Sequence, residues 1–229
     1  MNAPADGLEL RTAVIATALG MNAAGINVNK SGNVSARCVR GGVTGFVITP
    51  TGLPYARLTP EDLAFLPLRD DGEAEAHAHG PRAPSSEWHF HHDLYRARPE
   101  FGAVVHTHSC HATALACLGE GIPAFHYMVA AAGGADIRCS PYATFGTAQL
   151  SAHALAAMEG RKACLLAHHG VIAAGRDLEA ALALAIEVEN LARTYAEVRK
   201  LGTPRLLETA EMERVIAKFA TYGQPLSRK

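Results

Sequence analysis

The residues of this sequence best suited to chemistry are His106 and His108, which follow the apolar pair Val104-Val105. On an extended strand, residues two apart project to the same face, so both imidazoles would point toward one spot. Neutral imidazole is a ligand that Zn²⁺ and similar ions accept readily. The pattern predicts a strand that offers two ligands to one metal ion, although two ordinary polar residues at a strand end would show the same spacing.

A third imidazole is available from His168 or His169, which follow a second apolar segment, residues 163–167. A catalytic zinc site typically has three protein ligands and one open position. Adjacent residues on a strand face opposite ways, so the spacing does not choose between these two histidines. The sequence therefore predicts a three-histidine site and leaves the identity of its third ligand open.

The triplet Ser85-Ser86-Glu87 marks an expected helix start. Serine caps helices and glutamate favours the positive end of the helix dipole, which explains the triplet without any function. Free amides and hydroxyls at a helix N-terminus also form an anion site, and the turns Ser31-Gly32-Asn33 and Thr51-Gly52 are similarly small and polar. Together the three segments suit a phosphate held by amides and hydroxyls, with a carboxylate beside it.

The composition excludes several classes of function. Of the 229 residues 48% are hydrophobic and 19% charged, the net charge is −1, and no basic stripe marks a nucleic-acid-binding surface. No apolar run is long enough for a membrane span, and dinucleotide loops, phosphate loops and serine nucleophile elbows are absent. The five scattered cysteines and the lack of a secretion signal favour a reduced, cytoplasmic protein.

Apolar periodicity and turn signals predict one α/β domain over residues 1–229, with a mainly antiparallel central sheet flanked by helices. Gly41-Gly42 is the expected turn of a hairpin, and Thr147 and Asp177 are the expected N-caps of their helices. The predicted helices cover residues 8–26, 85–98, 109–117, 147–159, 177–201 and 208–221. The predicted strands cover residues 34–39, 43–49, 63–68, 102–108, 163–167 and 171–174.

The other histidines have less specific expected places. His111 and His126 are expected near the metal as supporting groups. The remaining histidines of the chain's middle part are expected at the surface or on a helix face; these are His77, His79, His89, His91 and His92. Because the last two lie on the Glu87 helix, support of the site by at least one of them is the alternative.

Long, ordered motifs connect these residues to a known pattern. They are SGNVSAR from Ser31, ITPTGLPY from Ile48, SSEW from Ser85, VVHTHSCHATA from Val104, IPAFHYMVAAAGG from Ile122, PYATFGT from Pro141, HHG from His168 and KFATYG from Lys218. The sequence resembles the class II aldolase/adducin family, and within it most closely the L-fuculose-1-phosphate aldolases. The match is poor only in the first 30 residues and in the loop 70–84.

The resemblance implies roles for individual residues. The metal ligands would be His106, His108 and His169, which resolves the third ligand in favour of the second histidine of its pair. Glu87 would be the catalytic acid–base and would also touch the metal when substrate is absent. The substrate phosphate would be held by Gly32, Asn33, Thr51, Gly52, Ser85 and Ser86.

The resemblance also implies a cofactor and an assembly. The metal would be one divalent ion per subunit, usually Zn²⁺, with Mn²⁺ or Co²⁺ as alternatives. The family typically forms a homotetramer with its sites between subunits. Tyr127, offered by a neighbouring subunit, and Tyr222 near the C-terminus would therefore assist proton transfer and aldehyde binding.

The implied activity is the reversible cleavage of a ketose 1-phosphate to dihydroxyacetone phosphate and an aldehyde. Candidate substrates are L-fuculose 1-phosphate, 5-deoxyribulose 1-phosphate and 5-methylthioribulose 1-phosphate, because the sequence does not show the aldehyde end of the site. Sugar-phosphate 4-epimerases of the L-ribulose-5-phosphate type share the fold, but the segment HYMVAAAGG from His126 favours an aldolase. A non-catalytic adducin-like interaction domain is disfavoured, since it needs neither three ligand histidines nor Glu87.

Overall fold

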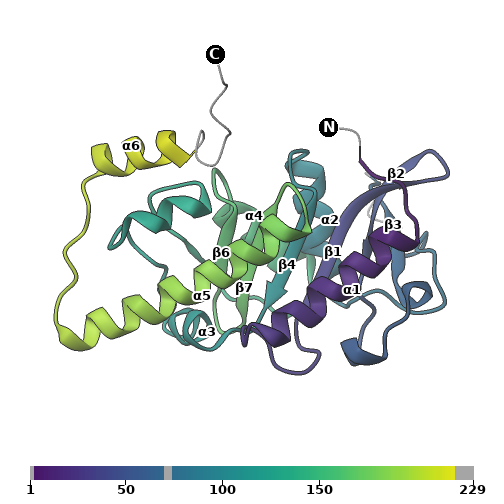
Figure 1. Ribbon diagram of the computed structural model, residues 1–229, viewed down its shortest axis with the longest axis horizontal. Helices are drawn as coiled ribbons and strands as arrows, with labels where there is room; N and C mark the ends of the chain where they lie inside the picture. The colour runs from purple at the N-terminus through teal and green to yellow at the C-terminus, as the bar shows by residue number, and fades with distance from the viewer. Residues whose placement is uncertain (1–2, 70–73, 220–229) are drawn as a thin grey trace, which may run out of the picture.

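The protein is built on one central sheet. The computed structural model describes residues 3–69 and 74–219, and within them the strands lie in the order β3-β2-β1-β4-β7-β6-β5 (Figure 1). The strands are β1 (Asn33–Arg40), β2 (Val43–Ile48), β3 (Ala64–Pro67), β4 (Ala103–Thr107), β5 (Cys139–Ser140), β6 (Ala163–Leu166) and β7 (Gly170–Gly175). Described neighbours pair antiparallel except β5 with β6. The expected mainly antiparallel sheet is confirmed.

Strand β4 is the middle of this sheet and carries the first ligand candidate near its end. All its residues are buried. Asn33 of β1 pairs with His106 on one side, and Ile172 of β7 pairs with it on the other. The backbone register therefore places the turn Ser31-Gly32-Asn33 directly beside the histidines.

Helices cover both faces of the sheet (Figure 1). They are α1 (Leu8–Ala23), α2 (Trp88–Ala97), α3 (Cys110–Cys117), α4 (Ala148–Ala157), α5 (Leu178–Leu201) and α6 (Thr209–Phe219). Helices α1, α3 and α5 share one hydrophobic core with Val105 of β4, and α2 and α4 share a second core with Val104. Because alternate strand residues face opposite ways, His106 points with Val104 toward α2, where its ring lies 5.4 Å from that of Phe90.

Local signals fix the ends of several elements as expected. Gly41 and Gly42, which have φ of 57° and 81°, form the tight turn between β1 and β2. Thr147 and Asp177 each accept a hydrogen bond from the backbone N–H three residues ahead, at 3.2 and 2.8 Å. Both predicted N-caps are therefore confirmed.

The ends of α1 and α2 differ from the expectation. Helix α1 ends at Ala23 and does not continue to residue 26. Helix α2 begins at Trp88, so Ser85 and Ser86 precede it instead of forming its first turn. Helix α6 is described to Phe219, and the expected residues beyond it lie outside the described part. It packs on η3 (Tyr127–Ala132), a 3₁₀ helix in the apolar segment after residue 122. Among the described residues, no helix combines the length and apolar character that a membrane crossing requires.

Candidate active site

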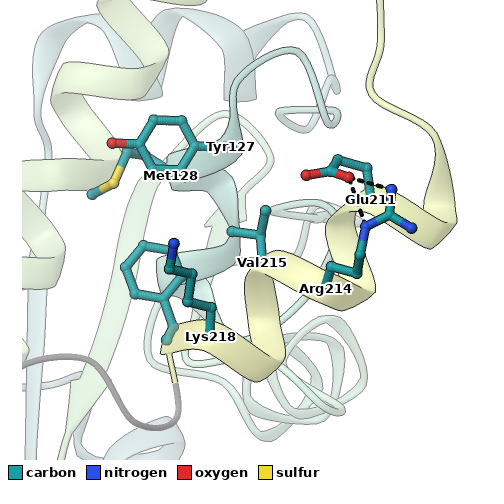
Figure 2. Close-up of a pocket in the computed structure, with 7 residues that line it drawn as sticks. Tyr127, Met128, Glu211, Arg214, Val215 and Lys218 are labelled. Carbon is teal, nitrogen blue, oxygen red and sulfur yellow. Dashed lines mark hydrogen bonds and ion pairs between the residues drawn. The ribbon is translucent and has the colours of Figure 1, made fainter.

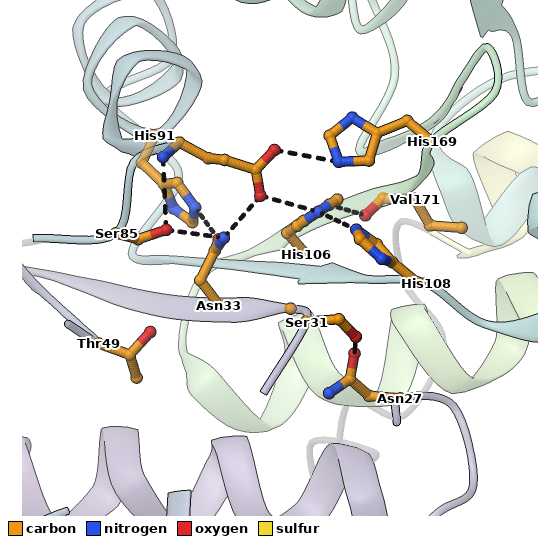
Figure 3. A network of polar contacts seen from close by, with 12 residues as sticks. Asn27, Ser31, Asn33, Thr49, Ser85, His91, His106, His108, His169 and Val171 are labelled. Carbon is orange, nitrogen blue, oxygen red and sulfur yellow. Dashed lines mark hydrogen bonds and ion pairs between the residues drawn. The ribbon is translucent and has the colours of Figure 1, made fainter. Parts of the chain in front are cut away.

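Four side chains from three parts of the chain converge at the end of β4. One ligand atom each of Glu87, His106, His108 and His169 lies within 4.8 Å of the others. His106 ends β4 together with Thr107, His108 follows the strand, and His169 lies in the turn between β6 and β7. The ring centroids of the three histidines are each 4.9 Å apart, and Figure 3 shows their nitrogens directed toward one another.

The turn between β6 and β7 separates the two candidates for the third histidine. His168 has a φ of +55°, in the left-handed region, so the chain reverses there and does not continue as a strand. His169 turns its Nε2 to within 3.0 Å of Glu87 Oε1. His168 lies instead with its ring 6.0 Å from that of Tyr142. The structure therefore brings His169, and not its neighbour, into the cluster.

The tautomer of His106 leaves a lone pair directed into the cluster. Its Nδ1 donates to the carbonyl of Val171 at 2.8 Å, so the neutral ring keeps Nε2 without a proton. That Nε2 faces His108 Nε2 at 3.0 Å and Glu87 Oε2 at 3.1 Å. Oε1 of the same carboxylate is buried and receives no hydrogen bond among the described residues. Imidazole nitrogens and a carboxylate that converge on one point in this way fit a divalent cation, and three imidazoles with a carboxylate are ligands that zinc accepts.

Electrostatics in the cluster favour an ionised Glu87 carboxylate beside a neutral His108. Burial raises the pKa of Glu87, but His106 and His169 lower it further, so the net shift is downward. Burial, together with repulsion from the other two rings, lowers the pKa of His108 to about 3. A neutral His108 is the form that binds a metal.

Glu87 occupies the N-cap position of α2 without capping it. Its side chain makes no capping hydrogen bond, and Ser85 Oγ accepts only a long one of 3.4 Å from the Glu87 N–H. The Glu87 carboxylate turns to the histidines and accepts a hydrogen bond from Asn33 Nδ2 at 3.0 Å. The interpretation of this triplet as a simple helix cap is therefore wrong.

The residues expected to hold a phosphate lie on adjoining segments. Asn33 Nδ2 also donates to Ser85 Oγ at 3.0 Å, which joins the first turn to the segment before α2. The N–H of Thr51 donates to the carbonyl of Ala83 at 3.2 Å, which holds the second turn against the same segment. Asn33 and Ser85 are buried, whereas Thr51, Gly52 and Ser86 are exposed.

Sequence reasoning missed one cation at this place. Lys30 directly precedes the first turn, and its Nζ donates to the carbonyl of Gly52 at 2.5 Å, so an ammonium bridges the two turns. Lys30 stands beside the first small polar turn and not inside it, so the pattern of the turns alone does not indicate it.

A cavity of about 330 Å³ opens over the cluster. Glu87, His108 and His169 form its floor, and the exposed aromatic side chains of Tyr142 and Phe145 form part of its wall. Its further lining residues are Ser31, Ser86, Ala143 and His168. The site can therefore hold a small molecule with one polar, anionic end and one less polar end.

Two glycines allow the backbone to close in around the end of β4. A Cβ on Gly32 would lie 2.3 Å from the carbonyl oxygen of His106. A Cβ on Gly170 would lie 2.3 Å from the carbonyl oxygen of Thr107 and 2.9 Å from Cδ2 of His108. A side chain at either position would displace the ligand strand itself.

Of the two tyrosines expected to take part in catalysis, Tyr127 is described, and it does not lie at the cluster of its own chain. Tyr127 is 51% exposed and lines a second cavity of about 440 Å³ with residues of α6, among them Arg214 and Lys218 (Figure 2). The two cavities share no lining residue. Tyr222 lies outside the described residues.

His91 and His92 lie on a face of α2, as one of the expectations had it, but they are not surface residues. Both are buried, because α2 packs this face against the sheet and α4. His77 and His79 are exposed as expected, and His89 is half-buried. The two predicted supporting groups do not contact the cluster: His111 pairs with Glu189 at 2.8 Å, and the ring of His126 accepts a hydrogen bond from the Met128 N–H.

Comparison with known proteins agrees with this geometry. Residues 12–196 match the family model for the class II aldolase and adducin N-terminal domain. The chain is 55% identical over 220 residues to the 5-methylthioribulose-1-phosphate/5-deoxyribulose-1-phosphate aldolase of Rhodospirillum rubrum, covering 96% of this chain and 95% of that protein. It is 47% identical over 216 residues to the L-fuculose phosphate aldolase of Escherichia coli K12, covering 94% and 96%.

The fold is similar to that of a solved L-fuculose 1-phosphate aldolase. The TM-score is 0.86 at 34% identity, and the match covers 93% of this chain and 97% of that one. A family match over most of the sequence, relatives of near-equal length and the same fold point to one conclusion. The chain belongs to the class II aldolase and adducin family.

Proposed function

We propose that the chain is a metal-dependent aldolase that reversibly cleaves a ketose 1-phosphate into dihydroxyacetone phosphate and an aldehyde. The observation that supports this most directly is the convergence of Glu87 with three histidines at the floor of a small cavity. The names of two relatives with 55% and 47% identity describe the same type of reaction. An adducin-like binding domain would have no use for such a cluster.

One divalent cation per subunit would be held by His106, His108 and His169, with Glu87 as a further contact when substrate is absent. We propose Zn²⁺, because nitrogen ligands in this number with an open position are typical of catalytic zinc, whereas Mn²⁺ and Co²⁺ are alternatives. When bound, the cation supplies Lewis-acid chemistry that polarises substrate oxygens and stabilises the negative charge that develops during cleavage. The hydrogen bond from His106 Nδ1 to Val171 orients that ring for its ligand role.

Glu87 would handle the proton at C3 of the three-carbon fragment. When the C3–C4 bond breaks, its electron pair stays on the C3 side, and the proton of the C4 hydroxyl passes to the ionised carboxylate of Glu87 as C4 becomes the aldehyde carbon. Protonated Glu87 then delivers a proton to C3, and in the direction of synthesis its carboxylate removes that proton. The side chain is buried and held by Asn33, which fixes its orientation and keeps bulk water away.

The substrate phosphate would lie against the turns 31–33 and 51–52 and the segment Ser85-Ser86. Amide N–H groups and hydroxyls from these segments would donate hydrogen bonds to it, and the ammonium of Lys30 would supply a full positive charge beside the turns. Burial of Asn33 and Ser85 makes this part of the site rigid, since each is held by hydrogen bonds from a different element.

The aromatic wall bears on the choice of substrate. Tyr142 and Phe145 are 59% and 64% exposed, so the cavity offers apolar surface near the metal ligands. Burial of a methyl or methylthio group against apolar surface contributes favourable binding free energy, whereas a hydroxylated tail requires hydrogen-bond partners. We propose 5-methylthioribulose 1-phosphate and 5-deoxyribulose 1-phosphate as preferred substrates, ahead of L-fuculose 1-phosphate.

We further propose that the working enzyme is a homotetramer in the cytoplasm. Tyr127 is exposed and remote from the cluster of its own chain, which suits a residue that completes the site of a neighbouring subunit. Tyr222, from the C-terminal segment, would join it there. All five cysteines are unpaired, as expected in a reducing compartment.

Product analysis tests the proposed function. The purified protein, loaded with Zn²⁺, is incubated with each of the three ketose 1-phosphates and with L-ribulose 5-phosphate, and dihydroxyacetone phosphate is measured by a coupled reductase. Release of dihydroxyacetone phosphate with an aldehyde supports an aldolase, and the fastest substrate identifies the preferred tail. Conversion of L-ribulose 5-phosphate without it would show an epimerase. A protein that purifies without metal and turns over none of the four would be an adducin-like domain.

A further inference from the structure

A buried chain of hydrogen bonds runs from Glu87 into the protein and ends at Tyr95. From Oε2 of Glu87 it passes to Asn33 Nδ2 at 3.0 Å, and from Asn33 Oδ1 to His91 Nε2 at 2.5 Å. It continues from His91 Nδ1 to Ser35 Oγ at 2.7 Å and from Ser35 Oγ to the Tyr95 hydroxyl at 2.8 Å. All five residues are buried, and the site as proposed does not use the last three. Figure 3 shows Asn33 beside His91 and Ser85.

We infer that His91 is a positioning residue, which holds the Asn33 side-chain amide in the one orientation that directs its NH₂ group to Glu87. This inference rests on the proposed function of Glu87. It assigns a role in the aldolase site to a histidine that touches neither the metal ligands nor the cavity.

The direction of every hydrogen bond follows from the carboxylate. An ionised carboxylate only accepts hydrogen bonds, so Asn33 must present its NH₂ to Glu87 and its carbonyl oxygen to His91. His91 must then donate from Nε2. A neutral ring that donates from Nε2 accepts at Nδ1, so Ser35 donates there and in turn accepts from the Tyr95 hydroxyl.

The neutral ring that this arrangement requires is the one that the surroundings favour. His91 is completely buried, and burial lowers its pKa to about 3, so the ring carries a single proton at neutral pH. That proton resides on Nε2, where Asn33 Oδ1 fixes it. All hydrogen bonds between Tyr95 and Glu87 therefore run in one direction, with each donor directed toward Glu87.

Without His91 the Asn33 amide would lose this constraint. Its two ends are nearly equal in shape, so a rotated amide fits the same space. The rotated form places a carbonyl oxygen against Glu87 Oε2 and against Ser85 Oγ, where the NH₂ group now donates at 3.0 Å to each. The carboxylate would then turn away from its place between His106 and His169.

The fold makes His91 a rigid support for this purpose. Glu87 and His91 are four residues apart, one turn along the start of α2, so both project toward β1. Asn33 lies on β1 and pairs in register with His106 of β4. The amide is thus held between a helix and the ligand strand, and His91 sets its rotation.

Two substitutions of His91 distinguish a role in positioning Asn33 from a role in packing the core. In His91→Gln the amide NH₂ reaches the place of Nε2 and can still donate to Asn33. In His91→Asn the amide reaches only the place of Nδ1, so contact with Ser35 remains while the bond to Asn33 is lost. His92→Gln is the matched control, because His92 is equally buried on the same helix but contacts Asp93 and the Arg69 N–H instead of the site.

The test measures kcat, KM, bound Zn²⁺ and melting temperature for the wild type and the three variants. We expect His91→Asn to lower kcat by about 10- to 100-fold, the usual effect of removing an outer partner of a metal-site residue. His91→Gln should retain most of kcat, although both His91 variants melt at a lower temperature. His92→Gln should match the wild type in kcat, and Zn²⁺ should stay at one per chain throughout. Equal losses in His91→Asn and His91→Gln would show a packing role and overturn the inference.

Crystal structures of the two His91 variants provide a readout that does not depend on turnover. We expect Asn33 rotated and Glu87 displaced in His91→Asn, and both unchanged in His91→Gln. An unmoved Glu87 in His91→Asn would overturn the inference even if the kinetics were altered. A wild type that releases no dihydroxyacetone phosphate from any ketose 1-phosphate would overturn the proposed function alone, since the structural comparison still decides the role of His91.

Discussion

Replacement of Glu87 by Gln removes the charge of the carboxylate and little else. The amide has nearly the same size, and its oxygen can still accept the hydrogen bond that Asn33 donates at 3.0 Å. Its NH₂ group would face Nε2 of His169, which lies 3.0 Å from Glu87 Oε1 and accepts a hydrogen bond when the ring carries its proton on Nδ1. Because each contact can keep a donor opposite an acceptor, we expect the fold to tolerate the change.

The expected loss lies in the chemical step. Glutamine cannot take up or release the proton at C3, and a positioned acid–base group contributes about 10²- to 10⁴-fold to the rate. That range corresponds to about 3–5 kcal/mol in the activation free energy, at about 1.4 kcal/mol per tenfold change. Three imidazoles remain to hold the cation, so metal should be retained while kcat falls by at least about 100-fold.

The assay compares kcat, bound Zn²⁺ and melting temperature in Glu87→Gln and the wild type. Glu189→Gln is the matched control, because Glu189 is a half-buried carboxylate that also contacts a histidine, His111 at 2.8 Å, but lies away from the cluster. It should lower the melting temperature and leave kcat unchanged. Near-normal turnover by metal-loaded Glu87→Gln would refute the acid–base role.

Four further predictions concern the rest of the site. A chelator should abolish turnover, and added Zn²⁺ should restore it, which an activity assay measures. His108→Ala should bind Zn²⁺ at least about tenfold more weakly because one of three imidazoles is lost, and a metal-binding titration measures this. Lys30→Met should raise KM for a ketose 1-phosphate about tenfold with kcat nearly constant, because one charge-assisted hydrogen bond to phosphate is lost; an unchanged KM would contradict this. Because the pKa of His91 is about 3 in the folded protein, below that of an unfolded histidine, unfolding takes up a proton and the free energy of unfolding should fall as pH drops below about 6.5. Urea titrations of the metal-free protein should show a shallower pH slope in His91→Gln than in the wild type, by at most about 1.4 kcal/mol per pH unit. Mixed tetramers of Tyr127→Phe and Glu87→Gln subunits should recover activity that neither variant shows alone, and no recovery would argue against sites shared between subunits.

The parts of the fold that depend on local physics could be predicted from the sequence. The hairpin at Gly41-Gly42 and the caps at Thr147 and Asp177 result from backbone preferences that act over a few residues. The approach of His106 to His108 follows from the two-residue period of a strand. These features need no knowledge of distant segments.

Other parts of the site depend on contacts that spacing does not encode. The choice of His169 requires the left-handed turn at His168, which the apolar pattern of the preceding strand does not reveal. The burial of His91 is not evident from the sequence, because a polar residue interrupts the apolar pattern of a helix whether or not it is buried with hydrogen-bond partners. The proposed role of Tyr127 in a neighbouring site would depend on how subunits assemble, and neither the periodicity of the sequence nor the structure of a single chain reveals that.

The closeness of Gly32 and Gly170 to the ligand strand constrains how this protein can diversify. A mutation that adds a side chain at either position must move His106 or His108. Selection would therefore remove such a mutation, because it would impair the metal site before any new activity could arise. The exposed wall at Tyr142 and Phe145 lacks such close neighbours of the ligand strand and is free to vary in size and polarity. Laboratory evolution toward new aldehydes should therefore randomise the wall and keep both glycines fixed.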